Sequence, residues 1–314
     1  MSTDLRTRLG RLELANPIMT AAGCAGTGRE LARFVDVAQL GAVVTKSVTL
    51  EPRAGHPAPR MAETPSGMLS VTGMQGPGID VLLERDVPWL RSQGSRAAVS
   101  IGGGSAAEYA ELARRISGAS GVSMIEVNLS FPNPTGRGQD FADDPEEAAR
   151  VVHGVRSHAR SDIPVFAKLA PDVRNVVELA RACVDARADG FSLVNTVRGM
   201  VIDPGKLRPA VSGGGGVSGP AIRPLAVACV YNVHAALPRV PIIGMGGVRT
   251  GSDVVEFLAA GASAVAVGTV NFADPSACAR ILRELTEALD EHGVSSPASL
   301  VGAAHRSARV DAEQ

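Results

Sequence analysis

The stretch "PIIGMGGVRTGSDVVEFLAAGASAVAVGTV" spans residues 241–270 and contains two apolar runs separated by an amphipathic segment. The runs, 241–248 and 264–270, are almost continuous in apolar residues, which is typical of parallel strands buried on both faces. Residues 252–260 between them have the pattern of a helix. A strand, a helix and a second strand in this order predict one unit of a parallel α/β sheet.

Six further runs of the same kind precede this unit. They are "NPIMTAAG" (16–23), "AVVTKSVT" (42–49), "AAVSIGG" (97–103), "SMIEVNLS" (123–130), "PVFAKLAP" (164–171) and "GFSLVNT" (190–196). Helices are expected over 143–160 and 174–187. Eight strands alternating with helices predict an α/β fold of the (β/α)8 TIM barrel type, which needs about 250 residues.

We expect one barrel domain over residues 1–303 and a loose tail over 304–314. A doubly wound open sheet is the alternative, and it would place a G-x-G-x-x-G fingerprint after the first strand. The segment that follows the first strand, "GCAGTGRE" (23–30), has the different spacing G-x-x-G-x-G. The barrel is therefore favoured over the open sheet.

The composition indicates a globular protein that acts on a small molecule. The chain of 314 residues is 45% hydrophobic and 20% charged, with a formal net charge of −1. No basic run supports nucleic-acid or membrane-surface binding, and no signal core or apolar stretch of about 18 residues is present. We expect a cytoplasmic protein. The four scattered cysteines predict free thiols, and the absence of metal-ligand spacing predicts no metal site.

Two segments are too long to be tight turns, namely residues 51–80 and 197–219. Both follow predicted strands, so they lie at the end of a barrel where binding sites form. A third segment, "PNPTGRGQDF" (132–141), combines Pro and Gly after the fourth strand. We predict that it forms a mobile lid over the barrel mouth.

Polar residues occur where the predicted strands end, which is where barrel enzymes place their catalytic groups. In chain order they are Lys46, Ser47, Ser100, Asn128, Lys168, Asn195 and Thr196. Lysines within apolar strands are costly unless they are paired or used, and neither lysine has an acidic neighbour in its own strand. We therefore expect both ammonium groups to face an anionic ligand. Glu126 is expected to form a structural pair inside the barrel rather than to act in catalysis.

Glycines follow the last two strands, at Gly246, Gly247 and Gly268, and Thr269 comes next. Exposed backbone N–H groups at this place in a barrel can hold a phosphate, although the glycines could merely form tight turns. A phosphate site with two lysines and several amides nearby suits FMN better than a nicotinamide cofactor. Asn128 would suit the polar edge of the flavin ring, and Lys168 could stabilise the reduced ring.

At these residues the chain resembles the class 1 dihydroorotate dehydrogenases, most closely the class 1B catalytic subunit. The resemblance covers residues 5–300. It rests on "NPIMTAAGC", "KSVTLEPRAGHPAPRMAETPSGMLS", "NLSFPN", "KLAP", "VNT", "SGPAIRP", "IIGMGGV" and "AVAVGTVNFADP", in the family's order and spacing. It implies a TIM barrel with FMN at the C-terminal ends of the strands, a homodimer, and a second subunit that carries FAD and a [2Fe–2S] cluster.

The resemblance also assigns residues to the cofactor and the substrate. The implied FMN contacts are Ala22, Lys46, Ser47, Ser100, Asn128, Lys168, Val194, Gly219, Gly246, Gly247, Gly268 and Thr269. The implied substrate contacts are Lys46, Ser70, Thr72, Gly73, Met74, Asn128, Asn133, Asn195 and Thr196.

The departures from the family lie in the substrate pocket. Phe131 occupies the position of the family's catalytic base, which is Cys in class 1. The phenylalanine side chain can neither give nor accept a proton. Ser70 and Gly76 each stand where the family has Asn, and Ser100 replaces an Asn near the flavin. The pattern favours an oxidoreductase with an altered substrate that needs only hydride transfer. The alternatives are a dihydroorotate dehydrogenase of pyrimidine biosynthesis that uses another base, for which Thr72 is the candidate, and a non-catalytic flavin-binding protein.

Overall fold

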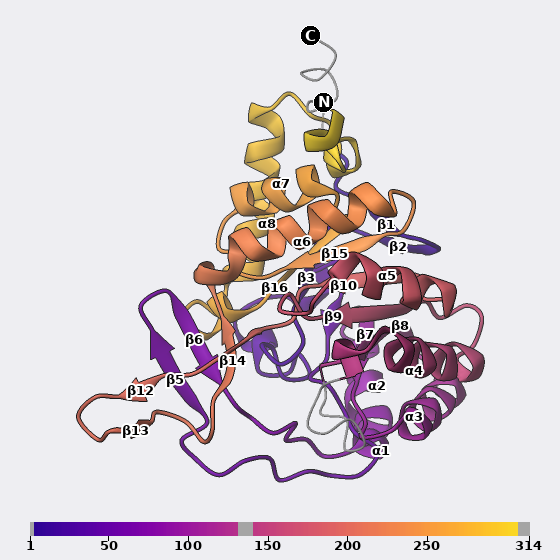
Figure 1. Cartoon of the computed structure of the whole chain (residues 1–314). Coiled ribbons are helices and arrows are strands. Elements are labelled where there is room, and N and C mark those ends of the chain that lie inside the picture. Colours follow the sequence, from indigo (N-terminus) through magenta and orange to yellow (C-terminus); the bar gives the residue numbers. More distant parts are fainter. Residues whose placement is uncertain (1–2, 131–140, 307–314) are drawn as a thin grey trace.

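In a computed structural model that describes residues 3–130 and 141–306, eight parallel strands form one sheet (Figure 1). The sheet order is β3-β16-β15-β10-β9-β8-β7-β4. The strands are β3 (Ile18–Thr20), β4 (Val43–Val44), β7 (Ala97–Ile101), β8 (Val122–Asn128), β9 (Val165–Leu169), β10 (Gly190–Leu193), β15 (Ile242–Met245) and β16 (Ala264–Val267). A parallel bridge between Met19 and Ala42 joins the two ends of the sheet, so the sheet closes into the predicted barrel.

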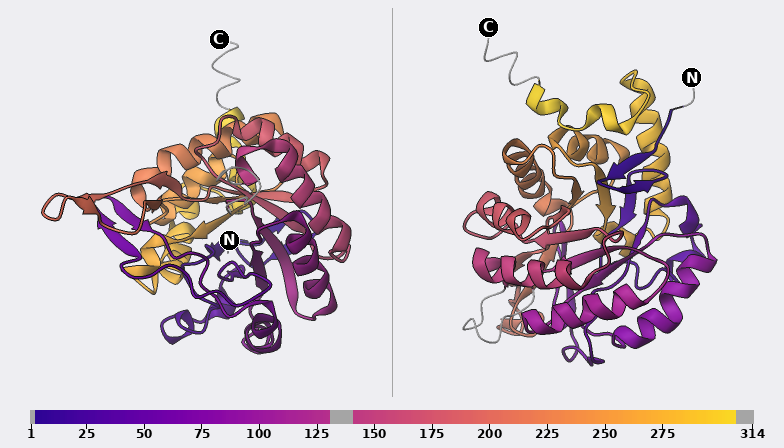
Figure 2. Two further views of the ribbon diagram at one scale, coloured as in Figure 1. Left: turned by 60° about the horizontal axis from the view of Figure 1, so that its bottom comes forward. Right: turned by 90° about the vertical axis from the view of Figure 1, so that its right-hand side faces the viewer.

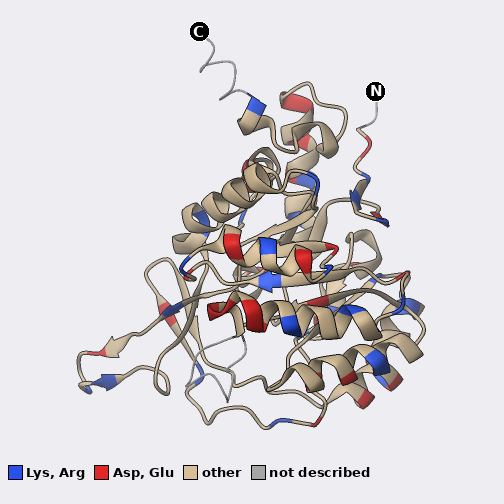
Figure 3. Ribbon diagram, turned by 45° about the vertical axis from the view of Figure 1, so that its right-hand side comes forward, with Lys and Arg blue, Asp and Glu red and all other residues tan. Residues whose placement is uncertain are grey.

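Helices cover the outside of the barrel, as the views in Figure 2 show. They are α1 (Ile79–Val81), α2 (Val87–Ser92), α3 (Ala106–Gly118), α4 (Pro145–His158), α5 (Val176–Asp185), α6 (Arg223–Ala236), α7 (Gly251–Ala260) and α8 (Ala277–Glu291). The helices predicted over 143–160, 174–187 and 252–260 correspond to α4, α5 and α7. Lysine, arginine and acidic residues are interspersed over the elements visible in Figure 3, which agrees with the net charge of −1.

Local signals in the sequence explain where these helices begin. The Asp144 carboxylate accepts hydrogen bonds from the backbone N–H groups of Glu146 and Glu147, and Pro145 occupies the first helical position of α4. Thr250 and Asp253 form a reciprocal capping box at the start of α7. The strand β4 is shorter than the predicted run 42–49, because the pairing with β7 becomes irregular after Val44. The N–H groups of Thr45 and Val48 donate to Ala98 O and Ser100 O, so a step of three residues here lies opposite a step of two in β7.

Apolar side chains fill the end of the barrel interior that lies next to the hairpin of β1 (Thr7–Leu9) and β2 (Leu12–Leu14). Met19, Met124, Phe166 and Ile243 form this filling with smaller residues, and Leu9 and Leu14 close it at that end. Leu9 and Leu14 come from this hairpin. The interior is a packed core, so a ligand has room only at the ends of the strands.

The two long insertions pair with each other. Residues 51–80 contribute β5 (Met61–Thr64) and β6 (Gly67–Ser70), and residues 197–219 contribute β11 (Val197–Gly199) and β14 (Gly215–Ser218). Together they form an antiparallel sheet in the order β11-β14-β6-β5. A separate hairpin of β12 (Ile202–Asp203) and β13 (Arg208–Pro209) projects from this sheet (Figure 1).

Only residues 304–306 of the expected tail fall within the described chain. There the His305 ring stacks on Tyr231 of α6 at 3.8 Å between centroids, and its Nε2 lies 3.0 Å from Ala260 O. The domain boundary at residue 303 stays a prediction. Among the described residues, none of the helices is both long and apolar enough to cross a membrane.

His234 gives the fold a pH-dependent stability. Burial, helped by the charges of His305 and Arg306, lowers the pKa of His234 below 6.5, and its buried Nδ1 has no partner in the part of the chain that the structure describes. The unfolded chain therefore takes up a proton more readily, and stability should fall as pH drops below about 6.5 through the folded pKa. Thermal unfolding followed by circular dichroism should show a smaller pH slope for His234→Gln than for the control His292→Gln. Equal slopes would contradict this prediction.

Candidate functional site

A network of hydrogen bonds links the ends of four strands of the barrel. Asn195 Nδ2 donates to Asn128 Oδ1 at 3.0 Å, and Asn128 Nδ2 donates to Ser47 Oγ at 3.2 Å. Ser47 Oγ lies 2.8 Å from Ser100 Oγ. The Thr196 N–H donates to Asn195 Oδ1 at 2.9 Å. The structure thus brings together five of the predicted residues, and the network fixes the orientation of both amides.

Lys46 lies beside this network and approaches the first insertion. Its Nζ is 3.5 Å from Thr72 Oγ1, at the limit of a hydrogen bond. Burial, with a smaller effect of Arg60, lowers the pKa of Lys46. A lysine with a lowered pKa is more often neutral, and a neutral amine can accept a proton. The contact therefore places the Thr72 hydroxyl next to a group that can act as a base.

Lys168 does have a carboxylate partner, contrary to our expectation from the sequence. Its Nζ lies 3.4 Å from Glu126 Oε1, and both side chains are almost completely inaccessible to solvent. The residues sit on neighbouring strands, β8 and β9, rather than in one strand. The sequence shows neighbours along a strand but not across the sheet, which is why this partner was overlooked. The expected structural pair of Glu126 is confirmed, and its partner is Lys168.

Two residues at the site were not identified from the sequence. Cys24 contacts the site, because a Cβ placed on Gly268 would lie 3.5 Å from the Cys24 Sγ. Burial raises the pKa of Cys24 to about 11, although Lys168 and Lys46 oppose this shift. Tyr109 Oη donates to the backbone oxygen of Asn128 at 2.5 Å and anchors the end of β8. The position of Cys24 directly after the first predicted strand was the available signal.

A cavity of about 470 Å³ lies where the glycine loops meet the first insertion. Its lining includes Gly219, Gly247, Arg249 and Thr269, together with residues 63–68. The loops approach closely, because a Cβ on Gly219 would lie 2.6 Å from the Cα of Gly67 and one on Gly247 would lie 2.8 Å from Gly219 O. Positive φ angles of 100° and 76° at these two glycines also favour Gly. A backbone cradle with one arginine suits a phosphate group.

The remaining predicted cofactor residues surround the same end of the barrel. Val194 is buried, with its N–H bonded to Met245 O at the end of β15. Ala22 packs on the interior filling, and a Cβ on Gly246 would meet Ala226 of α6 at 2.8 Å.

A second cavity, of about 450 Å³, is lined by Lys46 and Ser47. Residues 75–77 and Arg53 line it from the first insertion. The predicted substrate segment 70–74 leads into this wall. Ser70 ends β6, and the backbones of Gly73 and Met74 turn with φ of 67° and 55°. The insertion therefore forms a wall of the site, as its length predicted.

Some predictions concern residues outside the described chain. Phe131, Asn133 and nearly all of the lid predicted over 132–141 lie there, so the roles of these residues stay predictions. In the described ranges, no cluster of three His, Cys, Asp or Glu side chains could hold a metal ion.

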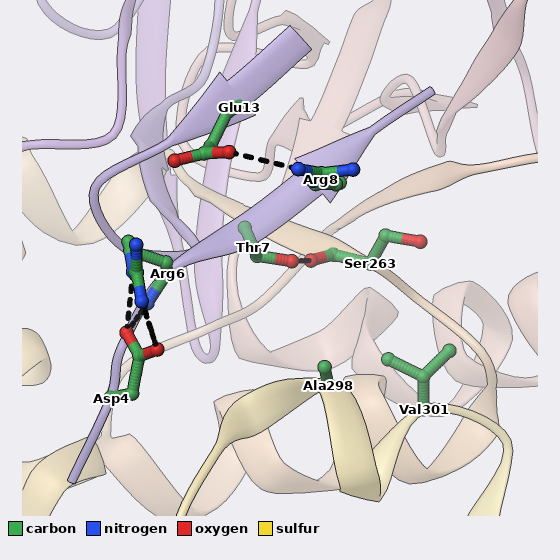
Figure 4. Close-up of a pocket in the computed structure, with 8 residues that line it drawn as sticks. All are labelled: Asp4, Arg6, Thr7, Arg8, Glu13, Ser263, Ala298 and Val301. Atoms are coloured by element: carbon green, nitrogen blue, oxygen red, sulfur yellow. Dashed lines mark hydrogen bonds and ion pairs between the residues drawn. The ribbon is translucent and has the colours of Figure 1, made fainter. Parts of the chain in front are cut away.

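A third cavity, of about 430 Å³, lies at the opposite end of the barrel beside the β1–β2 hairpin (Figure 4). Its charged groups are paired with each other: Arg6 with Asp4 at 2.8 Å, and Arg8 with Glu13 at 3.2 Å. Thr7 Oγ1 donates to Ser263 O. These groups are already satisfied, so this cavity is a poor candidate for the functional site.

Comparison with known proteins shows the family to which the chain belongs. The family model for dihydroorotate dehydrogenase matches residues 4–289. A protein of Anoxybacillus flavithermus named dihydroorotate dehydrogenase B (NAD(+)), catalytic subunit, is 47% identical over 290 residues, covering 92% of each chain. A protein of the same name from Desulforamulus reducens is 44% identical over 306 residues, covering 97% of this chain and all of its own. The Geobacter sp. counterpart is 43% identical over 301 residues, covering 96% and 98%. The chain belongs to the dihydroorotate dehydrogenase family, whose members are oxidoreductases that act on a CH–CH group.

Proposed function

We propose that this protein is an FMN-dependent oxidoreductase that oxidises dihydroorotate or a close relative of it. The observation that carries the proposal is the convergence of Lys46, Asn128, Lys168 and Asn195 at one end of the barrel, next to a glycine cradle. The names of the relatives support dihydroorotate as the substrate.

The residues at the strand ends fit FMN. The cradle of Gly219 and Gly247 with Arg249 suits its phosphate. Asn128 and Asn195 offer amide groups whose orientation is fixed, and Lys168 offers a buried ammonium group. The other FMN contacts implied by the resemblance surround these groups. Bound there, FMN would supply the hydride acceptor for oxidation of the substrate carbon.

The proton of the neighbouring substrate carbon needs a separate acceptor, because the position of the family's base is occupied by Phe131. Cys24 is unsuited to this role, since its pKa of about 11 keeps it a thiol. We assign the role to Thr72, whose Oγ1 accepts a hydrogen bond from Lys46 Nζ in the structure. When Lys46 is neutral, the Thr72 hydroxyl can pass its own proton to Nζ as its oxygen takes the proton of the substrate carbon. Enzymes with a Ser–Lys catalytic pair use a lysine in the same way, to accept the proton of a hydroxyl group.

A second candidate function follows from Phe131 and from Ser70 and Gly76. If these residues shape a less polar pocket, the substrate is a different small molecule that needs only hydride transfer. The remaining alternative is a non-catalytic flavin-binding protein. Dihydroorotate oxidation predicts that dihydroorotate reduces the bound flavin, whereas both alternatives predict that the flavin stays oxidised.

For electron transfer, we propose a partner subunit that carries FAD and a [2Fe–2S] cluster, and a homodimer of this chain in the cytoplasm. The words "catalytic subunit" and "NAD(+)" in the relatives' names support a separate subunit for the nicotinamide reaction. The four cysteines of this chain are free and lie apart in the sequence, so the chain by itself does not offer a cluster site.

The decisive experiment mixes the purified, FMN-loaded protein with dihydroorotate under anaerobic conditions and follows the visible flavin absorbance. We expect the absorbance to fall in a reaction whose rate rises with pH, because Lys46 must be neutral to accept a proton. Flavin that binds but stays oxidised would contradict dihydroorotate oxidation and favour a different substrate or a non-catalytic role. A protein that does not bind FMN would overturn the proposal.

A further inference from the structure

Above the apolar filling of the barrel lies a layer of polar side chains on four consecutive strands. Met124, Phe166 and Ala98 belong to the filling, and the residues two positions further along each strand face the same interior. These are Glu126 on β8, Lys168 on β9 and Ser100 on β7, with Ser192 on β10 completing the layer. All four side chains are at least nine-tenths buried.

This polar layer is incompletely satisfied. Glu126 Oε1 is engaged by Lys168 at 3.4 Å, whereas the buried Oε2 has no hydrogen-bond partner in the described ranges. The buried Ser192 Oγ, whose strand pairs with Lys168, is also without a partner there. A buried carboxylate with one unpaired oxygen lowers the stability of the fold, and an apolar side chain of similar size at this position would avoid that cost. Its presence under the candidate cofactor site therefore calls for a function.

We infer that Glu126 is a positioning residue that sets the reduction potential of the flavin through Lys168. The inference rests on the FMN binding proposed above. A reduced flavin carries more negative charge than an oxidised one, so the Lys168 ammonium favours reduction. The Glu126 carboxylate holds that ammonium in place and cancels part of its field, which makes reduction less favourable. Charges so deeply buried are poorly screened, so the effect reaches a ligand at the strand ends.

The test measures the midpoint potential of bound FMN in the wild type and in Glu126→Gln. Glutamine keeps the size and the Oε1 acceptor but removes the charge. We expect the equilibrium between oxidised and reduced flavin to shift at least tenfold toward reduced, which is about 30 mV for a two-electron couple. Glu126→Asp keeps the charge and should leave the equilibrium between oxidised and reduced flavin within a few-fold of that in the wild type. Ser192→Ala, which removes the other unsatisfied atom but no charge, is the matched control and should not shift it.

A role limited to packing predicts a different result. In that case Glu126→Gln would have the same flavin midpoint potential as Glu126→Asp, or the same potential as Ser192→Ala. Either result would overturn the inference. If Glu126→Gln does not fold, Glu126→Leu, which also removes the charge and has a similar volume, takes its place, and the same tenfold shift is expected. A wild type that binds no FMN refutes the proposed function itself, whereas bound FMN with an unchanged potential refutes only this inference.

Discussion

Replacing Lys168 with Met should lower the free energy of unfolding by about 3–5 kcal/mol, because it leaves a fully buried carboxylate at Glu126 without its counter-charge. Urea unfolding of the flavin-free protein, followed by circular dichroism, measures the change. Adding Glu126→Gln should recover a large part of the loss, since removing both charges leaves no unpaired ion.

The control is Lys206→Met, which breaks a pair with Asp203 at 3.2 Å on the surface. The Lys206 side chain is 64% exposed, and an exposed pair contributes about 0–1 kcal/mol. Equal losses in Lys168→Met and Lys206→Met would show that the buried pair has no special energetic weight. A double variant as unstable as Lys168→Met would show that the lysine is needed for packing rather than for charge.

Thr72→Val should slow the reduction of bound flavin by dihydroorotate by about 10²–10⁴-fold, the usual contribution of a general base. Valine has nearly the shape of threonine but lacks the hydroxyl that contacts Lys46. Anaerobic stopped-flow absorbance measures the rate. The rise of the rate with pH should also disappear, because Lys46 no longer receives the proton.

Thr72→Ser keeps the hydroxyl and should retain most of the rate. The control Thr286→Val removes a hydroxyl on α8 that donates to Leu282 O and should leave the rate unchanged. An undiminished rate in Thr72→Val would exclude Thr72 as the proton acceptor. In that case Lys46 itself would be the next residue to test.

The barrel could be predicted from the sequence because parallel strands buried on both faces leave a simple pattern. The runs that became β15 and β16 show it, and so does the helix α7 between them. The site was predicted in part. Lys46 and Asn128 stand at the ends of apolar runs, whereas the partner of Lys168 depends on the register between β8 and β9, which no local pattern reports.

Pairing between the two insertions was likewise beyond local reasoning. Each was identified as too long for a turn, but β6 and β14 are far apart in the chain, and their antiparallel contact depends on the closed barrel that brings them together. The place of the Cys24 thiol beside Gly268 likewise depends on the closed barrel, which brings the segment after β3 next to the segment after β16.

The sheet shared by the two insertions limits which changes in the length of either insertion the protein can tolerate, in engineering or in evolution. Its inner strands, β6 and β14, each satisfy the backbone of the other. Shortening either insertion would turn its neighbour into an unprotected edge strand, with free N–H and C=O groups that invite pairing with another molecule. Loop grafting at this end should therefore exchange both segments together. A chain that loses one segment alone is expected to aggregate before it changes its substrate preference.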